Sequence, residues 1–100
     1  MRLLAELLDP VEAETPYGGR VVSYEPLGSV WLKIEGRRRR ERIEAGVTSA
    51  VDAAVAETRL DPRLNEGRLV RFGGSDWVIA SVNGDSDRPG RVSLNIERTR

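Results

Sequence analysis

Closely spaced turn signals in the last third of the chain constrain its fold most, because they leave room only for short strands. Residues 68–72 and 77–82 are rich in β-branched and aromatic side chains, and they flank a turn that contains Gly73 and Gly74. After a polar loop, residues 91–97 alternate strictly between apolar and polar side chains, as in a strand with one buried face. These three segments predict an antiparallel meander.

Two further strands are expected at residues 20–24 and 29–35. The second alternates, with aliphatic side chains on one face and with Trp31 and Lys33 on the other. Core or barrel-end packing is the ordinary role of an aromatic residue, but Trp31 points away from the aliphatic face. A subunit interface would give it an apolar partner, because Trp and Tyr are enriched at interfaces. We therefore expect Trp31, Lys33 and Tyr24 at a subunit interface.

The beginning and the middle of the chain carry helical signals. Four leucines near the N-terminus have helical spacing, but this stretch is short and stops at Pro10. Residues 37–55 are rich in Arg, Glu and Ala, which are good helix formers. The pattern predicts a short helix over residues 38–45 and favours a strand over 51–58, while propensity alone would extend the helix. Residues 46–58 are thus open between helix and strand.

Length and composition indicate a single domain spanning residues 1–100. A chain of 100 residues with 39% hydrophobic residues supports one hydrophobic core. The fold class expected is mostly β: a small β-barrel of about six or seven antiparallel strands with one short helix in the middle.

The residue types exclude most kinds of catalysis. The chain has no Cys and no His, so disulfides, thiolate or imidazole catalysis and the common zinc sites are absent. A Ser–Lys nucleophile pair would depend on Lys33, which lies in the middle of a predicted strand. We expect no enzyme activity, no cofactor and no metal, and hold a small hydrolase as a remote third alternative. No segment approaches the roughly 20 apolar residues of a membrane span, and the N-terminal apolar run is too short for a signal peptide. Synthesis and folding in the bacterial cytoplasm, with no membrane partner, are expected.

An arginine run is the sharpest local feature. Sixteen basic residues, all but Lys33 arginines, balance sixteen acidic ones, so the net charge is zero and a general nucleic-acid coat is disfavoured. Against phosphate the run would add salt-dependent affinity. On a solvated helix face it would instead pair with glutamates four residues away, as Arg37 with Glu41. No aromatic residue interrupts the run, which argues against base stacking. The candidates for a contact with nucleic acid or another anionic partner are Arg37, Arg38, Arg39, Arg40 and Arg42.

The order of landmarks along the chain resembles a known family. They are Tyr17-Gly18-Gly19, Tyr24, Gly28-Ser29-Val30-Trp31 with Ile34, Arg40-Glu41-Arg42 with Ala45, Gly67-Arg68-Leu69-Val70, Gly74, Trp77-Val78-Ile79, Val82, Leu94 and Glu97. In this order they resemble the head–tail joining (head closure, or stopper) proteins of tailed bacteriophages, of which gene transfer agents carry a similar version. The resemblance covers almost the whole chain. Residues 50–59 depart from the family's polar β segment, although the resemblance itself supports a strand there.

The resemblance implies a virion structural role. Such a protein is a small β-barrel that assembles as a ring, here expected with six or twelve copies, below the portal and its adaptor. Tail proteins, including the tail terminator, dock on the far side, and double-stranded DNA passes transiently through the lumen. In some members a loop between central strands plugs the channel, and by position that loop falls within residues 36–50. This range includes the arginine run, so the resemblance makes the run the candidate lumen or partner contact. The alternative, from the arginine run, is a small nucleic-acid-binding β-barrel that uses residues 37–42.

Overall fold

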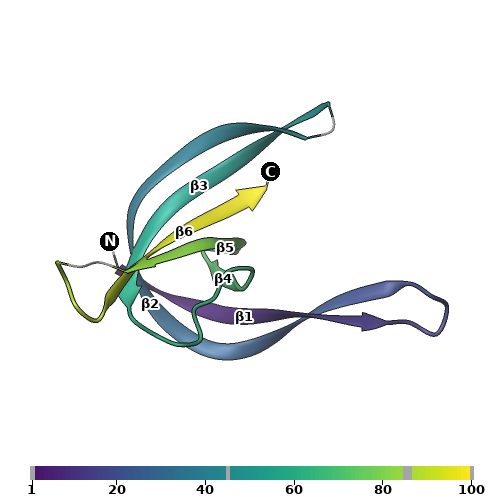
Figure 1. Ribbon diagram of the computed structural model, residues 1–100, viewed down its shortest axis with the longest axis horizontal. Helices are drawn as coiled ribbons and strands as arrows, with labels where there is room; N and C mark the ends of the chain where they lie inside the picture. The colour runs from purple at the N-terminus through teal and green to yellow at the C-terminus, as the bar shows by residue number, and fades with distance from the viewer. Residues whose placement is uncertain (1, 45, 85–86, 100) are drawn as a thin grey trace.

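Six antiparallel strands form one sheet that closes on itself (Figure 1). The computed structural model describes residues 2–44, 46–84 and 87–99, and their side chains except at 39–44, 47–49 and 99. Around the ring the hydrogen-bonded order is β1-β2-β3-β6-β5-β4. The strands are β1 (Arg2–Glu14), β2 (Arg20–Glu44), β3 (Val47–Arg59), β4 (Leu69–Phe72), β5 (Ser75–Gly84) and β6 (Arg91–Thr99).

The mostly-β prediction is confirmed, with six strands. The meander predicted from the last third of the chain is β4-β5-β6, and its strands are neighbours in the closed sheet. Between β4 and β5 the loop is only Gly73-Gly74, with φ values of 60° and 77°. Two successive positive φ angles are what the tight type I′ hairpin turn requires, and only glycine adopts them at no steric cost.

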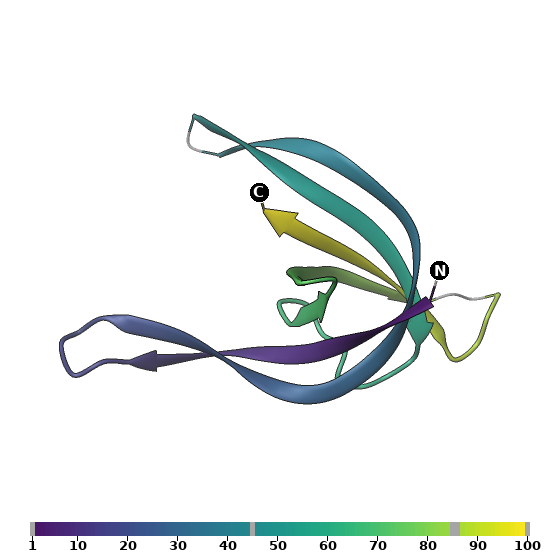
Figure 2. The same ribbon diagram turned by 180° about the vertical axis from the view of Figure 1, so that it is seen from behind.

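β2 is unusual because its 25 residues serve two different hairpins. Its first half pairs with β1 between Arg20 and Lys33, and its second half pairs with β3 from Lys33 onward. The register skips Leu27 in the first half and Glu35 in the second. Each extra residue is a β-bulge, which bends the strand and increases its twist. The bulges let one strand leave the β1 hairpin and curve into the β3 hairpin, and the two hairpins extend from the body in different directions (Figures 1 and 2).

The helix predicted over residues 38–45 is wrong. Residues 38–44 belong to β2 and pair in register with β3, from Arg38 opposite Ala53 to Glu44 opposite Val47. Residue 45 lies outside the described residues, and Gly46 at φ 79° belongs to the connection. Helix propensities differ by less than about 1 kcal/mol per residue, and a continuous ladder of pairing outweighs them. Residues 51–58 are a strand, as favoured, within β3.

The N-terminal segment is also a strand. Leu7 and Leu8 are both buried although they are consecutive, and the register shift opposite Leu27 lies between them. A bulge breaks the two-residue alternation of a strand, so two neighbouring leucines become buried. This break in alternation is what gave the N-terminal leucines their helix-like spacing.

The core fills the interior of the closed sheet with aliphatic side chains from every strand. Its most buried large members are Leu7, Leu32, Val70, Ile79, Leu94 and Ile96. Leu64, from the loop between β3 and β4, also joins the cluster. The described residues form no helix that could span a membrane.

Candidate assembly surfaces

A stacked aromatic pair lies beside the β4–β5 turn at one end of the sheet. The rings of Phe72 and Trp77 are 5.6 Å apart and nearly parallel, with an interplanar angle of 3°. Two guanidinium groups lie over Trp77, Arg98 at 5.0 Å and Arg37 at 5.7 Å from the ring centroid. Arg37 is also 6.0 Å from the Phe72 centroid. A cation over an aromatic face is attracted by the ring quadrupole, so the arginines stabilise this end of the core.

Arg98 also ties three strands together. Its guanidinium donates to a carboxylate oxygen of Asp52 on β3 at 2.6 Å and to Ser75 Oγ on β5 at 2.6 Å. Asp52 is among the few buried charged residues. We call Arg37, Asp52, Phe72, Trp77 and Arg98 the mouth cluster.

The two arginines of the run whose side chains are described, Arg37 and Arg38, lie on opposite faces of β2. Because the bulge at Glu35 shifts the alternation, Arg37 lies opposite Ala54, which is a core residue, and reaches the aromatic pair. Arg38 lies opposite Ala53 on the other face of the strand, and both arginines are exposed. The side chains of Arg39, Arg40 and Arg42 lie outside those described, although their backbone continues the β2 ladder. In a strand, residues four apart do not meet as in a helix, so the alternative in which Arg37 pairs with Glu41 on a helix face does not apply.

A second candidate surface is an open groove of about 540 Å³ on the flank of the sheet, beyond the point where β2 and β3 part. Trp31 lines it and is 63% exposed, as is Leu60 after the end of β3. Thr58 Oγ1 donates to the Trp31 carbonyl at 2.7 Å, which is the tie between the strands at this point. The flank groove is lined by Arg2, Ser29, Val30, Trp31, Leu32, Lys33, Glu57, Thr58, Arg59, Leu60, Asp61, Arg63 and Arg91.

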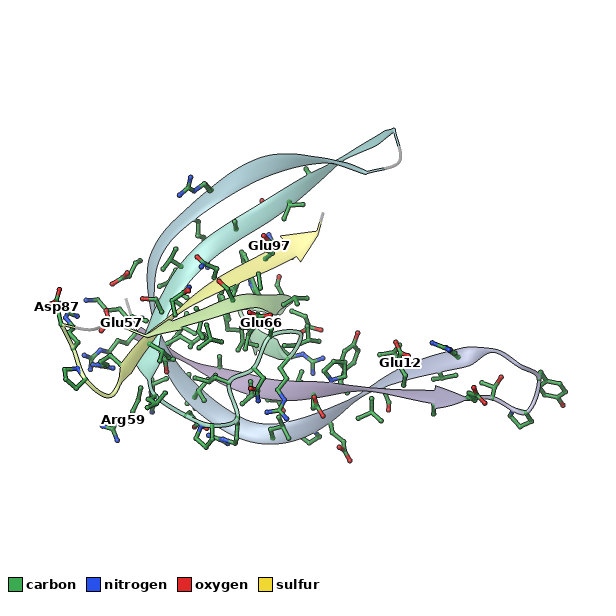
Figure 3. All side chains as sticks on the ribbon, viewed as in Figure 1. Glu12, Glu57, Arg59, Glu66, Asp87 and Glu97 are labelled. Atoms are coloured by element: carbon green, nitrogen blue, oxygen red, sulfur yellow. The ribbon has the colours of Figure 1, made fainter. Side chains whose placement is uncertain are left out.

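Glu57 and Arg59, both labelled in Figure 3, are β3 residues that line this groove. The carboxylate of Glu57 accepts from Arg88 at 3.0 Å and lies 3.6 Å from Arg91, which attaches the loop before β6 to β3. Burial raises the pKa of Glu57, but hydrogen bonds with Glu35 and Arg88 and the charges of Arg88 and Arg91 outweigh it. The net result is a lowered pKa for Glu57.

The groove floor is fixed by a latch formed by Asp61 and Arg63. Asp61 accepts from the Arg63 guanidinium at 2.7 Å and from its backbone N–H at 2.9 Å, and these hydrogen bonds lower the pKa of Asp61 to about 2. Arg63 also donates to the carbonyl of Leu27, the bulged residue of β2, at 2.6 Å. Gly28 follows at φ 119°, and any Cβ there would collide with Arg63. The latch thus requires a glycine at this bulge.

The third surface is the free end of the β1–β2 hairpin, residues 9–26, which we call the arm. Beyond Leu8, β1 has no second pairing partner among the described strands, and β2 has none before Lys33 on the side of β3. Both faces of the arm are open, so Val21, Val22 and Tyr24 are all about half exposed, and Tyr17 at the tip is 98% exposed. Trp31, Lys33 and Tyr24 are all exposed, and their place at a subunit interface stays a prediction. They do not form one patch, because Trp31 and Lys33 line the flank groove and Tyr24 is on the arm.

Sequence reasoning missed several residues of these surfaces. Arg98, Asp52 and Arg63 are scattered along the chain, and no local pattern links them. Leu60 and Val22 carried a usable signal: one is an apolar residue at the end of a strand before Asp61-Pro62, and the other lies in a short strand with apolar residues on both faces.

These features define a small antiparallel β protein whose conspicuous surfaces are suited to assembly. The profile of the phage head completion proteins matches residues 1–94, and the chain belongs to that family. No curated protein matches the chain by sequence.

Two solved structures share its fold. A chain from the virion of a native gene transfer agent particle superposes with a TM-score of 0.73 at 23% identity, covering 98% of this chain and 94% of that one. The protein xkdH of the phage-like element PBSX from Bacillus subtilis gives a TM-score of 0.58 at 12% identity, with 98% and 96% covered.

Proposed function

We propose that this protein is a head–tail connector subunit, a stopper that forms a ring between the portal with its adaptor and the tail of a phage or gene transfer agent particle. The observation that carries the proposal is the family match over residues 1–94. The likeness to a chain of a gene transfer agent virion supports it, because it extends over nearly the full length of both chains. The subunit is made in the host cytoplasm and is then built into the particle neck.

The form of the molecule suits a ring subunit. A ring of identical copies needs two different surfaces that bind each other head to tail, together with surfaces facing the components above and below. The flank groove and the arm are two such different surfaces, both with exposed apolar side chains. Rings of six or twelve copies are the expectation, with the portal or adaptor on one side and the tail terminator on the other.

The β2–β3 hairpin is the candidate for the lumen-facing or partner-contacting segment. It includes residues 36–50 and carries all five arginines of the run. A DNA channel needs weak, sequence-independent contacts, and a chain with zero net charge limits the total attraction to DNA. Arg37 and Arg38 are both exposed, and Arg38, on the strand face away from the aromatic pair, is the candidate for such a contact.

Electron microscopy of particles from a strain lacking the gene tests the proposal. Filled heads that fail to join tails, or that lose their DNA, are expected, and complementation with the intact gene should restore tailed particles. Normal tailed particles without the gene would end the proposal.

DNA retardation at several salt concentrations separates a connector from a free-standing nucleic-acid-binding protein. The connector should bind free DNA weakly. Tight binding, with a salt slope that falls when the arginine run is changed to alanine, would favour the nucleic-acid-binding alternative.

A further inference from the structure

The arm has the properties of a segment that is completed by another chain. A two-stranded hairpin alone is at best marginally stable in water, and a free strand edge is a template for pairing. This hairpin exposes apolar residues on both faces, including Val21, Val22 and Tyr24. Covering these side chains would stabilise the arm through the hydrophobic effect.

The arm is also acidic. Residues 9–26 hold four carboxylates (Asp9, Glu12, Glu14 and Glu25) and one arginine (Arg20), so their net charge is −4 + 1 = −3. Asp9 pairs with Arg68 and Glu12 with Arg20. Glu14 and Glu25 form no ion pair within the described part of the chain, so two carboxylates on the arm are available to an outside partner.

The flank groove has the opposite charge and a matching apolar centre. Its lining holds five basic and two acidic residues, a net charge of +5 − 2 = +3. Arg63 and Arg91 are engaged by Asp61 and Glu57. Arg2, Lys33 and Arg59 make no ion pair with any described residue, and they surround the exposed side chains of Trp31 and Leu60.

The arm extends away from the groove, which begins near the base of the arm at Ser29 and Arg63. Figure 3 shows Glu12 on the arm at one end and Glu57 and Arg59 at the other, along a long axis of 50 Å. An arm therefore does not reach the groove of its own chain. A contact between them joins two copies head to tail, which is the heterologous interface from which rings are built.

We propose that the arm of one copy docks in the flank groove of the next, with Val22 and Tyr24 against Trp31 and Leu60. Glu14, which lies on the same face of the arm as Val22 and Tyr24, then faces Lys33 and Arg59 of the neighbouring copy. The occupant is a second copy of this chain because the acidic apolar arm and the basic apolar groove complement each other in both charge and chemistry. This inference rests on the proposed function, since it specifies the joint of the ring.

Charge reversal tests the joint in assembling particles. The arm variant carries Glu14→Arg, and the groove variant carries Lys33→Glu. Each alone should lower the yield of tailed particles about ten-fold or more, because like charges then face each other across the joint. Co-expression of the two variants should restore the yield, since each reversed arm then meets a reversed groove. Glu66→Arg, an exposed charge reversal outside both surfaces, is the control and should have no effect.

Cross-linking provides a readout that does not depend on viability. The chain has no Cys, so Val22→Cys together with Leu60→Cys introduces the only two thiols. In purified particles a short bismaleimide should join the double variant into a ladder longer than dimers, whereas Val22→Cys alone should give no ladder.

The outcomes separate this joint from the connector role itself. A chain that is incorporated but gives no ladder, or reversed variants that fail to rescue each other, would overturn the arm–groove joint while leaving the connector role intact. Absence of the chain from the particles would overturn the connector role.

Discussion

The body of the sheet and the arm share the strand β2, yet similar residues have opposite surroundings in them. In the body, Val30 and Leu32 are buried inside the closed sheet. In the arm, Val21 and Val22 have the same strand geometry but no third or fourth strand to cover them. The difference shows that the sequence pattern of a strand identifies the apolar side chains that are suited to burial. In a protein that assembles with others, the surface that covers them need not belong to the same chain.

The largest effect is expected in the body. Leu94 is fully buried, so Leu94→Ala should lower the free energy of unfolding by about 2–5 kcal/mol through lost burial and an unfilled cavity. Leu4 lies on β1 with 54% of its surface exposed, and Leu4→Ala should cost less than about 0.5 kcal/mol. Urea unfolding measures both. Equal losses would mean that the closed sheet is not the stabilising unit.

The next largest loss of stability is expected for a substitution at the bulge of β2 that joins the arm to the body of the sheet. Gly28→Ala places a Cβ at φ 119° and against Arg63, which Asp61 and the Leu27 carbonyl hold in place. The backbone strain should cost about 1–3 kcal/mol. Gly36→Ala is the matched control, because Gly36 adjoins the other bulge of β2, has no positive φ and has open space around it. A stable Gly28→Ala variant would show that the arm is not anchored by the latch.

The latch also predicts a pH dependence. The Arg63 side-chain hydrogen bond, followed by the Arg63 backbone N–H, lowers the pKa of Asp61 from 3.8 to about 2. A carboxyl with a lowered folded-state pKa contributes stability that is complete above about pH 4 and is lost as pH falls toward 2. Asp61→Asn should therefore cost about 1–2 kcal/mol at pH 7 and progressively less below pH 4.

Urea unfolding of the unmodified protein and of Asp61→Asn at several pH values measures the difference in their free energies of unfolding. Asp76→Asn is the control: Arg71 lowers the pKa of Asp76 too, but this pair is exposed and should contribute less than about 0.5 kcal/mol. If the stability difference caused by Asp61→Asn stayed constant down to pH 2, the Asp61–Arg63 pair would not be its source.

The sequence predicted the features that depend on neighbouring residues in the chain, and it did not predict those that depend on tertiary pairing. Period-two alternation at residues 91–97 and the Gly73-Gly74 turn depend on neighbours in the chain, and both predictions are confirmed. The segment at 38–44 was mistaken for a helix because its strand state comes from pairing with β3, a tertiary interaction that composition does not encode. The mouth cluster was not predictable either, since Asp52 and Arg98 are 46 residues apart and meet only when β3 pairs with β6.

Two neighbouring arginines of β2 offer a finer comparison. Both are exposed, but Arg37 lies over Phe72 and Trp77, whereas Arg38 is on the opposite face of the strand. Arg37→Ala should lower stability by about 0.5–1 kcal/mol through the lost cation–π contact. Arg38→Ala should leave stability unchanged. Thermal unfolding measures the stability of the two variants. A larger loss of stability from Arg38→Ala than from Arg37→Ala would refute the placement of Arg37 in the mouth cluster.

The smallest effect on stability should accompany a clear effect on assembly. Val22→Thr keeps the volume and β-branching of a residue on the arm, so the free energy of unfolding should change by less than about 0.5 kcal/mol. Val78→Thr is matched to it, because Val78 is similarly exposed, at 43% against 47%, but lies on β5 in the body. If the arm is covered by a neighbouring copy, Val22→Thr places a hydroxyl in that joint and should lower the yield of tailed particles, while Val78→Thr should not. Equal yields from the two variants would mean that the apolar surface of the arm remains uncovered in the particle.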